Sequence, residues 1–241
     1  GVYVMGFDPA EQATRVAKYA YQQDINNVAV LAPNDAYGRQ VIQSFDKVAD
    51  ILGRQLKPVI KYSSGGGSLN QDIRTLAREG SVGARFSFAA LFLPEGGDKL
   101  GPIIGGLKAM NITPQTVQFI GTGLWDDREL IRNHDLNGAW LASSPPDTYL
   151  AFEQRFRNTY NYKPPRLSSL AYDAVALAST LAMGGQGFSR AALADPSGFS
   201  GPANGIFRFR KDGTAQRGLA VLRVNGTNGF EEIDPAPTSF K

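Results

Sequence analysis

The chain of 241 residues is 42% hydrophobic and 20% charged, a composition typical of folded globular proteins and too apolar for a disordered one. Its 25 basic residues are scattered among 22 acidic ones, for a net charge of +3, whereas nucleic-acid binding usually needs basic residues gathered on one face. There is no cysteine and only one histidine, His134, which excludes disulfides, thiolate chemistry and multi-histidine metal sites. No apolar run is long enough to span a bilayer. We therefore predict no nucleic-acid partner and no transmembrane segment.

The first 146 residues alternate between helical and strand patterns. The stretch Asp8-Pro9-Ala10-Glu11 carries the start signals of a helix. Apolar residues at helical spacing predict helices over about 9–23 and 38–52, around Ile73 and Leu76, around Leu100 to Leu107, and at about 126–132. Short apolar runs predict strands at 26–32, 56–62, 86–94, 116–121 and 138–143. Strands that alternate with helices form parallel sheets covered on both faces, so we predict a doubly wound α/β fold with a mostly parallel sheet.

The pattern changes after residue 146. Two helices follow in succession, over about 147–160 and 168–183, and their apolar surface exceeds what one sheet would cover. Residues 205–224 then form two strands around the turn "KDG", as a hairpin or a pair of edge strands. The expected segments are an α/β part over 1–146, extra helices over 147–204, and strands with a tail over 205–241.

Motifs that would carry catalysis or bind a cofactor are missing. The glycine-rich stretch "SSGGGS" at 63–68 lacks the Lys-Ser/Thr ending of a phosphate loop, and "GTG" at 121–123 lacks the spaced glycines of a dinucleotide turn. Adjacent carboxylates at Asp126 and Asp127 diverge by about 100° on a helix, so one of them more simply caps the predicted helix at 126–132. Neither Ser168 nor Ser169 lies in a nucleophile elbow. We predict a non-enzymatic chain without a catalytic, cofactor or metal site.

Polar side chains follow the predicted strands at their carboxyl ends, where open α/β sheets bind small molecules. The loops concerned read "APNDAYG", "YSSGGGS", "FLPEGG" and "GTGLWDD". They carry Tyr37, Glu95, Thr122 and Trp125, a mixture of aromatic, carboxylate and hydroxyl groups that suits a small polar ligand. We predict a binding cleft there.

Several segments resemble the type I periplasmic binding proteins, the family that includes branched-chain amino-acid receptors. The stretch "VAVLAPNDAYGRQVIQSFDKVADILGRQL" is similar to the opening of that family's second lobe, "SLAYDAVALASTLA" to its returning helix, and "GIFRFRKDG" to its closing strand. Together with "YVMGFDPAEQ", "LFLPEGGDKL", "GTGLWDD" and "PPRLSSLAYDAVALA", they look most like the penicillin-binding-protein activator branch. The resemblance covers nearly the whole chain.

The resemblance implies a two-lobed protein of which this chain is mostly the second lobe. Residues 1–146 would form the α/β part of that lobe, and 205–241 would supply the strands that complete it. Residues 147–204 would pack beside a first lobe that precedes Gly1 and is missing here.

The resemblance also bears on the ligand. Tyr37 and Tyr172 match aromatic positions that line the family's cleft, which adds Tyr172 to the predicted ligand-binding residues. Amino-acid receptors of this fold place a carboxylate in the loop that corresponds to "GTGLWDD", where it holds the ligand's ammonium group. The matching position here is near Gly123, which has no side chain, with Asp126 or Asp127 as the alternative carboxylates that could reach back to it. Amino-acid binding is therefore in doubt.

Two functions follow from the resemblance. The leading hypothesis is a non-enzymatic protein of the bacterial envelope, periplasmic or lipid-anchored, that activates peptidoglycan synthases. The alternative is a substrate-binding receptor that delivers amino acids or a related small polar ligand to an ABC permease.

Overall fold

The computed structural model describes residues 1–63, 67–127, 130–185, 187–226 and 229–240, so most of the "GGG" run in "SSGGGS" lies outside the described residues. The chain divides into two units. Unit 1 consists of Gly1–Asp8, Ser144–Ala220 and Asp234–Lys241, and unit 2 of Pro9–Ser143 and Val221–Ile233. These units differ from the expected segments, because both the first eight residues and residues 205–220 belong with the helices that follow residue 144.

Unit 2 is built on a seven-stranded sheet in the order β12-β11-β7-β6-β5-β1-β2. The pairs β1–β2, β1–β5, β5–β6 and β6–β7 are parallel, which confirms the predicted mostly parallel sheet. Its strands are β1 (Val28–Pro33), β2 (Leu56–Tyr62), β5 (Ala90–Phe92), β6 (Gln118–Ile120), β7 (Trp140–Ser143), β11 (Ala220–Val224) and β12 (Phe230–Asp234). Strand β5 is shorter than the predicted 86–94, because Phe86 pairs in a small hairpin of β3 (Ser81–Val82) and β4 (Arg85–Phe86).

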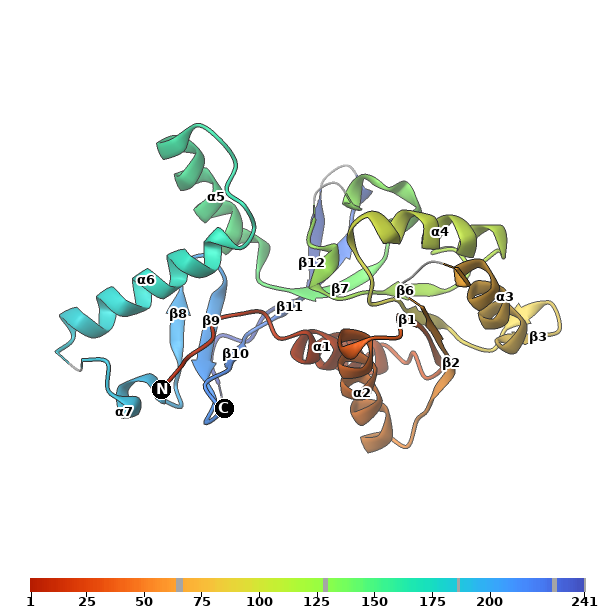
Figure 1. Cartoon of the computed structure of the whole chain (residues 1–241), viewed down its shortest axis with the longest axis horizontal. Coiled ribbons are helices and arrows are strands. Elements are labelled where there is room, and N and C mark those ends of the chain that lie inside the picture. The colour runs from red at the N-terminus through yellow and green to blue at the C-terminus, as the bar shows by residue number, and fades with distance from the viewer. Residues whose placement is uncertain (64–66, 128–129, 186, 227–228, 241) are drawn as a thin grey trace. The chain divides into compact units, whose positions relative to one another are not determined.

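Helices cover both faces of this sheet, with α1 and α2 on one face and α3 and α4 on the other (Figure 1). Their bounds are α1 (Pro9–Gln22), α2 (Ala36–Ile51), α3 (Leu69–Glu79) and α4 (Leu100–Ala109). Helix α2 begins where the Asp35 carboxylate accepts a hydrogen bond from the Gly38 amide at 2.8 Å, which satisfies one of the free amides of the first turn. The apolar side of each helix is buried against the sheet, as the periodicity predicts.

The predicted helix at 126–132 is wrong for the residues that the structure describes. Short 3₁₀ turns lie in and beside this stretch instead, namely η2 (Gly123–Trp125), η3 (Leu130–Arg132) and η4 (His134–Leu136). A further 3₁₀ turn, η1 (Gly97–Lys99), directly precedes α4. The Asp126 side chain accepts a hydrogen bond from the Ser143 hydroxyl at 2.7 Å, so it ties the loop to the end of β7 rather than capping a helix.

Unit 1 combines two long helices with a separate three-stranded antiparallel sheet in the order β10-β9-β8. Its elements are α5 (Pro146–Tyr160), α6 (Ser168–Met183), α7 (Arg190–Leu193), β8 (Phe199–Gly201), β9 (Gly205–Phe209) and β10 (Ala215–Arg217). The predicted strand pair around "KDG" is therefore confirmed. It does not complete the large sheet, because Phe207 and Phe209 of β9 pack with Tyr3 from the start of the chain and Leu177 of α6. Strands β11 and β12 complete the large sheet instead.

Candidate functional site

Four of the five predicted ligand-binding residues lie in unit 2, where their side chains and backbones contact one another. The Tyr37 and Thr122 hydroxyl oxygens are 2.8 Å apart, and the Trp125 indole donates a hydrogen bond to the Glu95 carbonyl at 2.7 Å. Tyr37 lies in the first turn of α2 after β1, Glu95 follows β5, and Thr122 and Trp125 follow β6. The carboxyl ends of neighbouring parallel strands meet at one edge of a sheet, which is why residues so distant in sequence converge here.

The Tyr37–Thr122 hydrogen bond is partly shielded from water. Thr122 is fully buried, whereas Tyr37 is half-buried. Burial is the main cause that raises the pKa of Tyr37 to about 12; the hydrogen bond to Thr122 opposes the shift, and the nearby carboxylates of Glu95 and Asp35 add to it. The phenol is therefore neutral at physiological pH.

Glu95 is held by a residue that the sequence analysis did not select. The Tyr62 hydroxyl donates a hydrogen bond to Glu95 Oε2 at 2.5 Å, and the Gly96 amide donates one to Glu95 Oε1 at 3.0 Å. Burial, followed by the hydrogen bond to Glu95, raises the pKa of Tyr62 well above its usual value. Tyr62 is the last residue of β2, so its place at the carboxyl end of a predicted strand was the signal that could have identified it.

Trp125, which was predicted to contact a ligand, has its ring packed inside the loop after β6. Its side chain is 0% exposed, and a Cβ placed on Gly121 would lie within 2.3 Å of the indole ring. The glycine after β6 is therefore needed to let the ring pack against the backbone. With the hydrogen bond to the Glu95 carbonyl, the indole joins the β6 loop to the β5 loop.

The space beside Gly123 is filled by Gln12 from helix α1. The Gly123 amide donates a hydrogen bond to Gln12 Oε1 at 3.0 Å, and a Cβ on Gly123 would lie 2.3 Å from Gln12 Nε2. The Gln12 side chain is itself buried. In the sequence, the only sign of this contact was a polar residue on the buried face of α1. Because its partner lies 111 residues away, the sequence did not indicate what the residue contacts.

The fifth predicted residue, Tyr172, lies on α6 in unit 1. Its ring packs against Phe152 of α5 with centroids 5.0 Å apart, and its hydroxyl accepts a long hydrogen bond from Arg155 at 3.4 Å. The side chain is 39% exposed. Its participation in one ligand site with the unit 2 residues stays a prediction.

Unit 1 contains a buried polar network that no sequence motif indicated. The Asp173 carboxylate accepts hydrogen bonds from the Ala203 amide and the Asn204 side chain, each at 2.8 Å. It also lies 3.7 Å from the Arg217 guanidinium, and both side chains are almost fully buried. Arg217 in turn donates to the Met5 carbonyl at 2.7 Å. The network joins α6, β10 and the start of the chain.

Metal binding has no support among the residues with described positions, where no group of three potential ligands occurs. Within the same residues, none of the helices has both the length and the apolar character needed to cross a bilayer.

A family model described as "Periplasmic binding protein" matches residues 1–229. The chain belongs to this family. Two solved structures of transport proteins are similar to it. A candidate branched-chain amino acid ABC transporter of Rhodospirillum rubrum is 20% identical with a TM-score of 0.80, and the match covers 96% of this chain and 67% of that one. The leucine-binding protein LivK of Thermotoga maritima is also 20% identical with a TM-score of 0.69, covering 93% of this chain and 65% of that one.

A third similar structure is that of a regulatory protein. The C-domain of LpoA from Haemophilus influenzae, a regulator of PBP1A, is 18% identical with a TM-score of 0.66, and the match covers 95% of this chain and 68% of that one. At these identities the similarities establish the fold alone. The chain spans about two thirds of the length of each of these three structures. No curated protein matches the chain by sequence.

Replacing Gly123 with alanine is expected to lower the free energy of unfolding of unit 2 by about 1–3 kcal/mol, because the new methyl group would displace Gln12 from its hydrogen bond. Urea denaturation followed by tryptophan fluorescence measures the change. The loss should be smaller when Gly123→Ala is introduced into Gln12→Ala, where the clash is gone. Equal losses in both backgrounds would contradict the assigned contact.

Raising the pH is expected to weaken unit 2 through Tyr37. The pKa of this phenol is about 12 in the folded chain and 10.0 ordinarily. The contribution of Tyr37 to the free energy of unfolding is therefore complete below about pH 10 and is lost as the pH rises towards 12. Tyr37→Phe should cost about 1 kcal/mol at pH 8, where the Thr122 hydrogen bond is lost, and should make the alkaline decline shallower. Urea denaturation at pH 8 and near pH 11 tests both effects, and an unchanged decline would refute this role.

Proposed function

We propose that the chain is part of a non-enzymatic envelope protein that regulates peptidoglycan synthases. The observation that carries the proposal is that the polar groups at the carboxyl ends of the strands pair with one another. Tyr37 pairs with Thr122, and Glu95 already accepts hydrogen bonds from Tyr62 and the Gly96 amide. A site that holds a charged solute tightly needs polar groups aimed at the ligand, whereas these groups stabilise the loops.

The surroundings of Gly123 support the same proposal. Amino-acid receptors of this fold carry a ligand-binding carboxylate at the matching position, and here the neutral carboxamide of Gln12 occupies the space beside the glycine. The Gln12 carboxamide carries no charge that could pair with an amino acid's ammonium group. The fold similarity to the LpoA C-domain is consistent with a regulatory role.

The family supports a periplasmic location for the protein, and lipid anchoring of the full-length protein belongs to the same proposal. The expected packing of the helices beside a first lobe is also a proposal. Large apolar side chains are exposed on and near α5 and α6, with Tyr160 at 57%, Leu167 at 71% and Val175 at 66%. Folded proteins seldom leave so many large apolar groups exposed together without a partner surface.

Capture of a synthase tests the regulatory role. The chain is immobilised and incubated with detergent extracts of Gram-negative envelopes, and the bound proteins are labelled with a fluorescent penicillin, which acylates the active-site serine of penicillin-binding proteins. We expect at least one labelled synthase to be retained by the chain and not by an amino-acid receptor of the same fold. Retention of no labelled protein would count against the proposal.

A second function, solute binding for an ABC permease, is favoured by a separate observation. The two similar transport proteins have TM-scores of 0.80 and 0.69, against 0.66 for the LpoA C-domain. This role predicts that the chain, extended to include a first lobe, binds an amino acid or another small polar ligand with a dissociation constant near 1 μM, or about −8 kcal/mol. Isothermal titration calorimetry against a panel of amino acids tests it, and an absence of heat across the panel would oppose it.

A further inference from the structure

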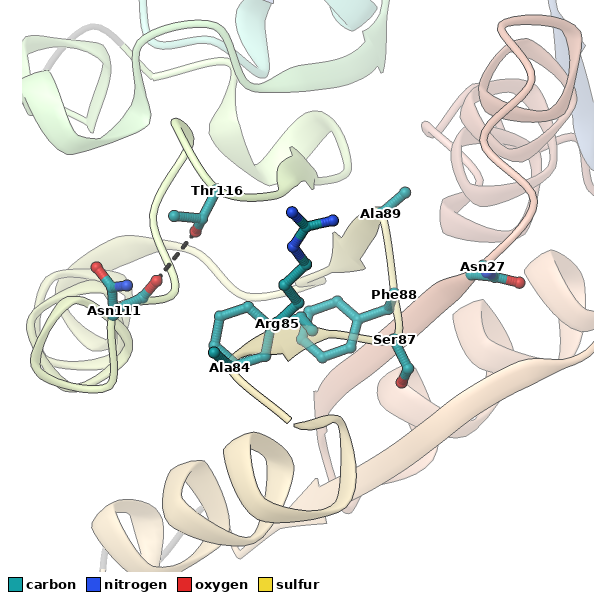
Figure 2. Close-up of a pocket in the computed structure, with 9 residues that line it drawn as sticks. Asn27, Ala84, Arg85, Ser87, Phe88, Ala89, Asn111 and Thr116 are labelled. Carbon is teal, nitrogen blue, oxygen red and sulfur yellow. Dashed lines mark hydrogen bonds between the residues drawn. The ribbon is translucent and has the colours of Figure 1, made fainter. Parts of the chain in front are cut away.

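A cavity of about 480 Å³ lies in unit 2 at the amino ends of the strands, the end opposite to Tyr37 and Glu95 (Figure 2). Asn27 directly precedes β1, Ala89 directly precedes β5, and Thr116 lies two residues before β6. The remaining wall comes from the β3–β4 hairpin and the residues after it. The cavity is open to solvent, since its lining residues other than Phe86 and Phe88 are exposed. Its volume falls within the range of about 300–1,000 Å³ that is usual for small-molecule sites.

The apolar part of the cavity is a pair of stacked phenylalanine rings. Phe86 and Phe88 have ring centroids 5.2 Å apart and an interplanar angle of 29°. Phe88 is 3% exposed, and a Cβ on Gly80 would lie 2.3 Å from its ring, so the backbone of the α3 C-terminus fixes its position. Phe88 therefore supports Phe86 from beneath, and the partly exposed ring of Phe86 offers a flat apolar surface on which another planar ring can stack.

The charged part is the guanidinium of Arg85, which extends from the hairpin into the space between Thr116 and Ala89 (Figure 2). Within the part of the chain that the structure describes, no side chain or backbone group forms an ion pair or hydrogen bond with this guanidinium. No aspartate or glutamate lines the cavity. A guanidinium presents paired N–H groups that match the two oxygens of a carboxylate.

Two carboxamides complete the polar lining. Asn27 and Asn111 lie on opposite sides of the cavity (Figure 2), and neither side chain has a hydrogen-bond partner among the described residues. The Thr116 hydroxyl donates to the Asn111 carbonyl at 3.0 Å, which fixes the loop that carries Asn111. The amide groups can donate or accept hydrogen bonds with polar substituents of a ligand.

We propose that this cavity binds a small organic carboxylate that carries a planar apolar ring. The carboxylate pairs with Arg85, and the ring stacks on Phe86, which Phe88 supports from beneath. The proposal does not depend on the function proposed above, because the cavity shares no residue with the site at the carboxyl ends of the strands.

Calorimetric titration with 2-naphthoate, compared with its uncharged isostere 2-naphthamide, tests the proposal on the whole chain. We expect 2-naphthoate to bind and 2-naphthamide to bind at least about tenfold more weakly, since the amide lacks the charge that pairs with Arg85. Arg85→Gln should reduce naphthoate affinity about tenfold or more, and Phe86→Leu should weaken both probes by a similar factor.

Arg74→Gln is the matched control, because Arg74 is also an exposed arginine and lies on α3, outside the cavity lining. It should leave naphthoate affinity unchanged. Equal affinities for the two probes, equal effects of Arg85→Gln and Arg74→Gln, or no binding of naphthoate at about 1 mM, which corresponds to about −4 kcal/mol, would overturn the proposal. Loss of naphthoate binding in Tyr37→Phe would assign the probe to the other end of the strands and would equally overturn it.

Discussion

Asp173→Ala is expected to lower the free energy of unfolding of unit 1 by about 3–5 kcal/mol, because it leaves the buried Arg217 guanidinium without its counter-charge. The change also removes the acceptor for the Ala203 amide and the Asn204 side chain. Burial already lowers the pKa of Arg217 to about 10, and the Asp173 carboxylate opposes that shift. Removing the carboxylate therefore makes the charged form of Arg217 still more costly.

The two tryptophans, Trp125 and Trp140, both lie in unit 2, so their fluorescence reports unit 2 alone. Hydrogen exchange of the β9 amides, followed by mass spectrometry, measures the opening of unit 1. Ser179→Ala on the exposed side of the same helix is the control and should change stability by less than about 0.5 kcal/mol.

A double variant tests whether the loss comes from the broken ion pair or only from changing a buried residue. Asp173→Ala combined with Arg217→Met removes both charges, and it should recover about 1–2 kcal/mol of the loss seen in Asp173→Ala alone. Additive losses from the two substitutions would show that the charges do not interact across their 3.7 Å separation.

Trp125→Ala should destabilise unit 2 by about 3–5 kcal/mol, because it empties a fully buried site of the largest side chain. It also leaves the Glu95 carbonyl without the indole N–H that it accepts at 2.7 Å. The loops after β5 and β6 should then open together. Far-UV circular dichroism during urea denaturation measures the loss, and the fluorescence of Trp140 follows the same transition.

Leu124→Ala is the control for Trp125→Ala. Leu124 is the preceding residue, it is 45% exposed, and alanine keeps the Cβ that packs beside Gly96. A loss of no more than about 1 kcal/mol is expected. Equal losses in the two variants would contradict the role given to the indole.

The sequence predicted the parallel sheet and most helices well, because those elements depend on local periodicity. Strand β2 and helix α6 match their predicted bounds of 56–62 and 168–183. The division into units was harder, because it depends on long-range packing. Phe207 and Phe209 alternate as in any half-buried strand, and nothing local specifies that they pack with Tyr3 and not on the large sheet.

The candidate site was predictable in outline but not in detail. The rule for carboxyl ends of strands selected Tyr37, Glu95 and Thr122, which lie together in unit 2, and their binding of a ligand stays a prediction. The same rule could have selected Tyr62, but it could not predict the hydrogen bond of Tyr62 to Glu95, nor the packing of Gln12 beside Gly123, because both contacts join residues far apart in the chain. No sequence pattern predicted the cavity at Arg85. Its wall depends on the β3–β4 hairpin, whose strands are only two residues long and too short to show a periodicity.

The most direct test of the proposed role is the rate of glycan polymerisation by a purified bifunctional peptidoglycan synthase, measured with and without a stoichiometric amount of the protein. An amino-acid receptor of the same fold serves as the control. The account predicts that the protein raises the synthase rate and that the receptor does not. An unchanged rate, together with micromolar binding of an amino acid by the two-lobed protein, would contradict it.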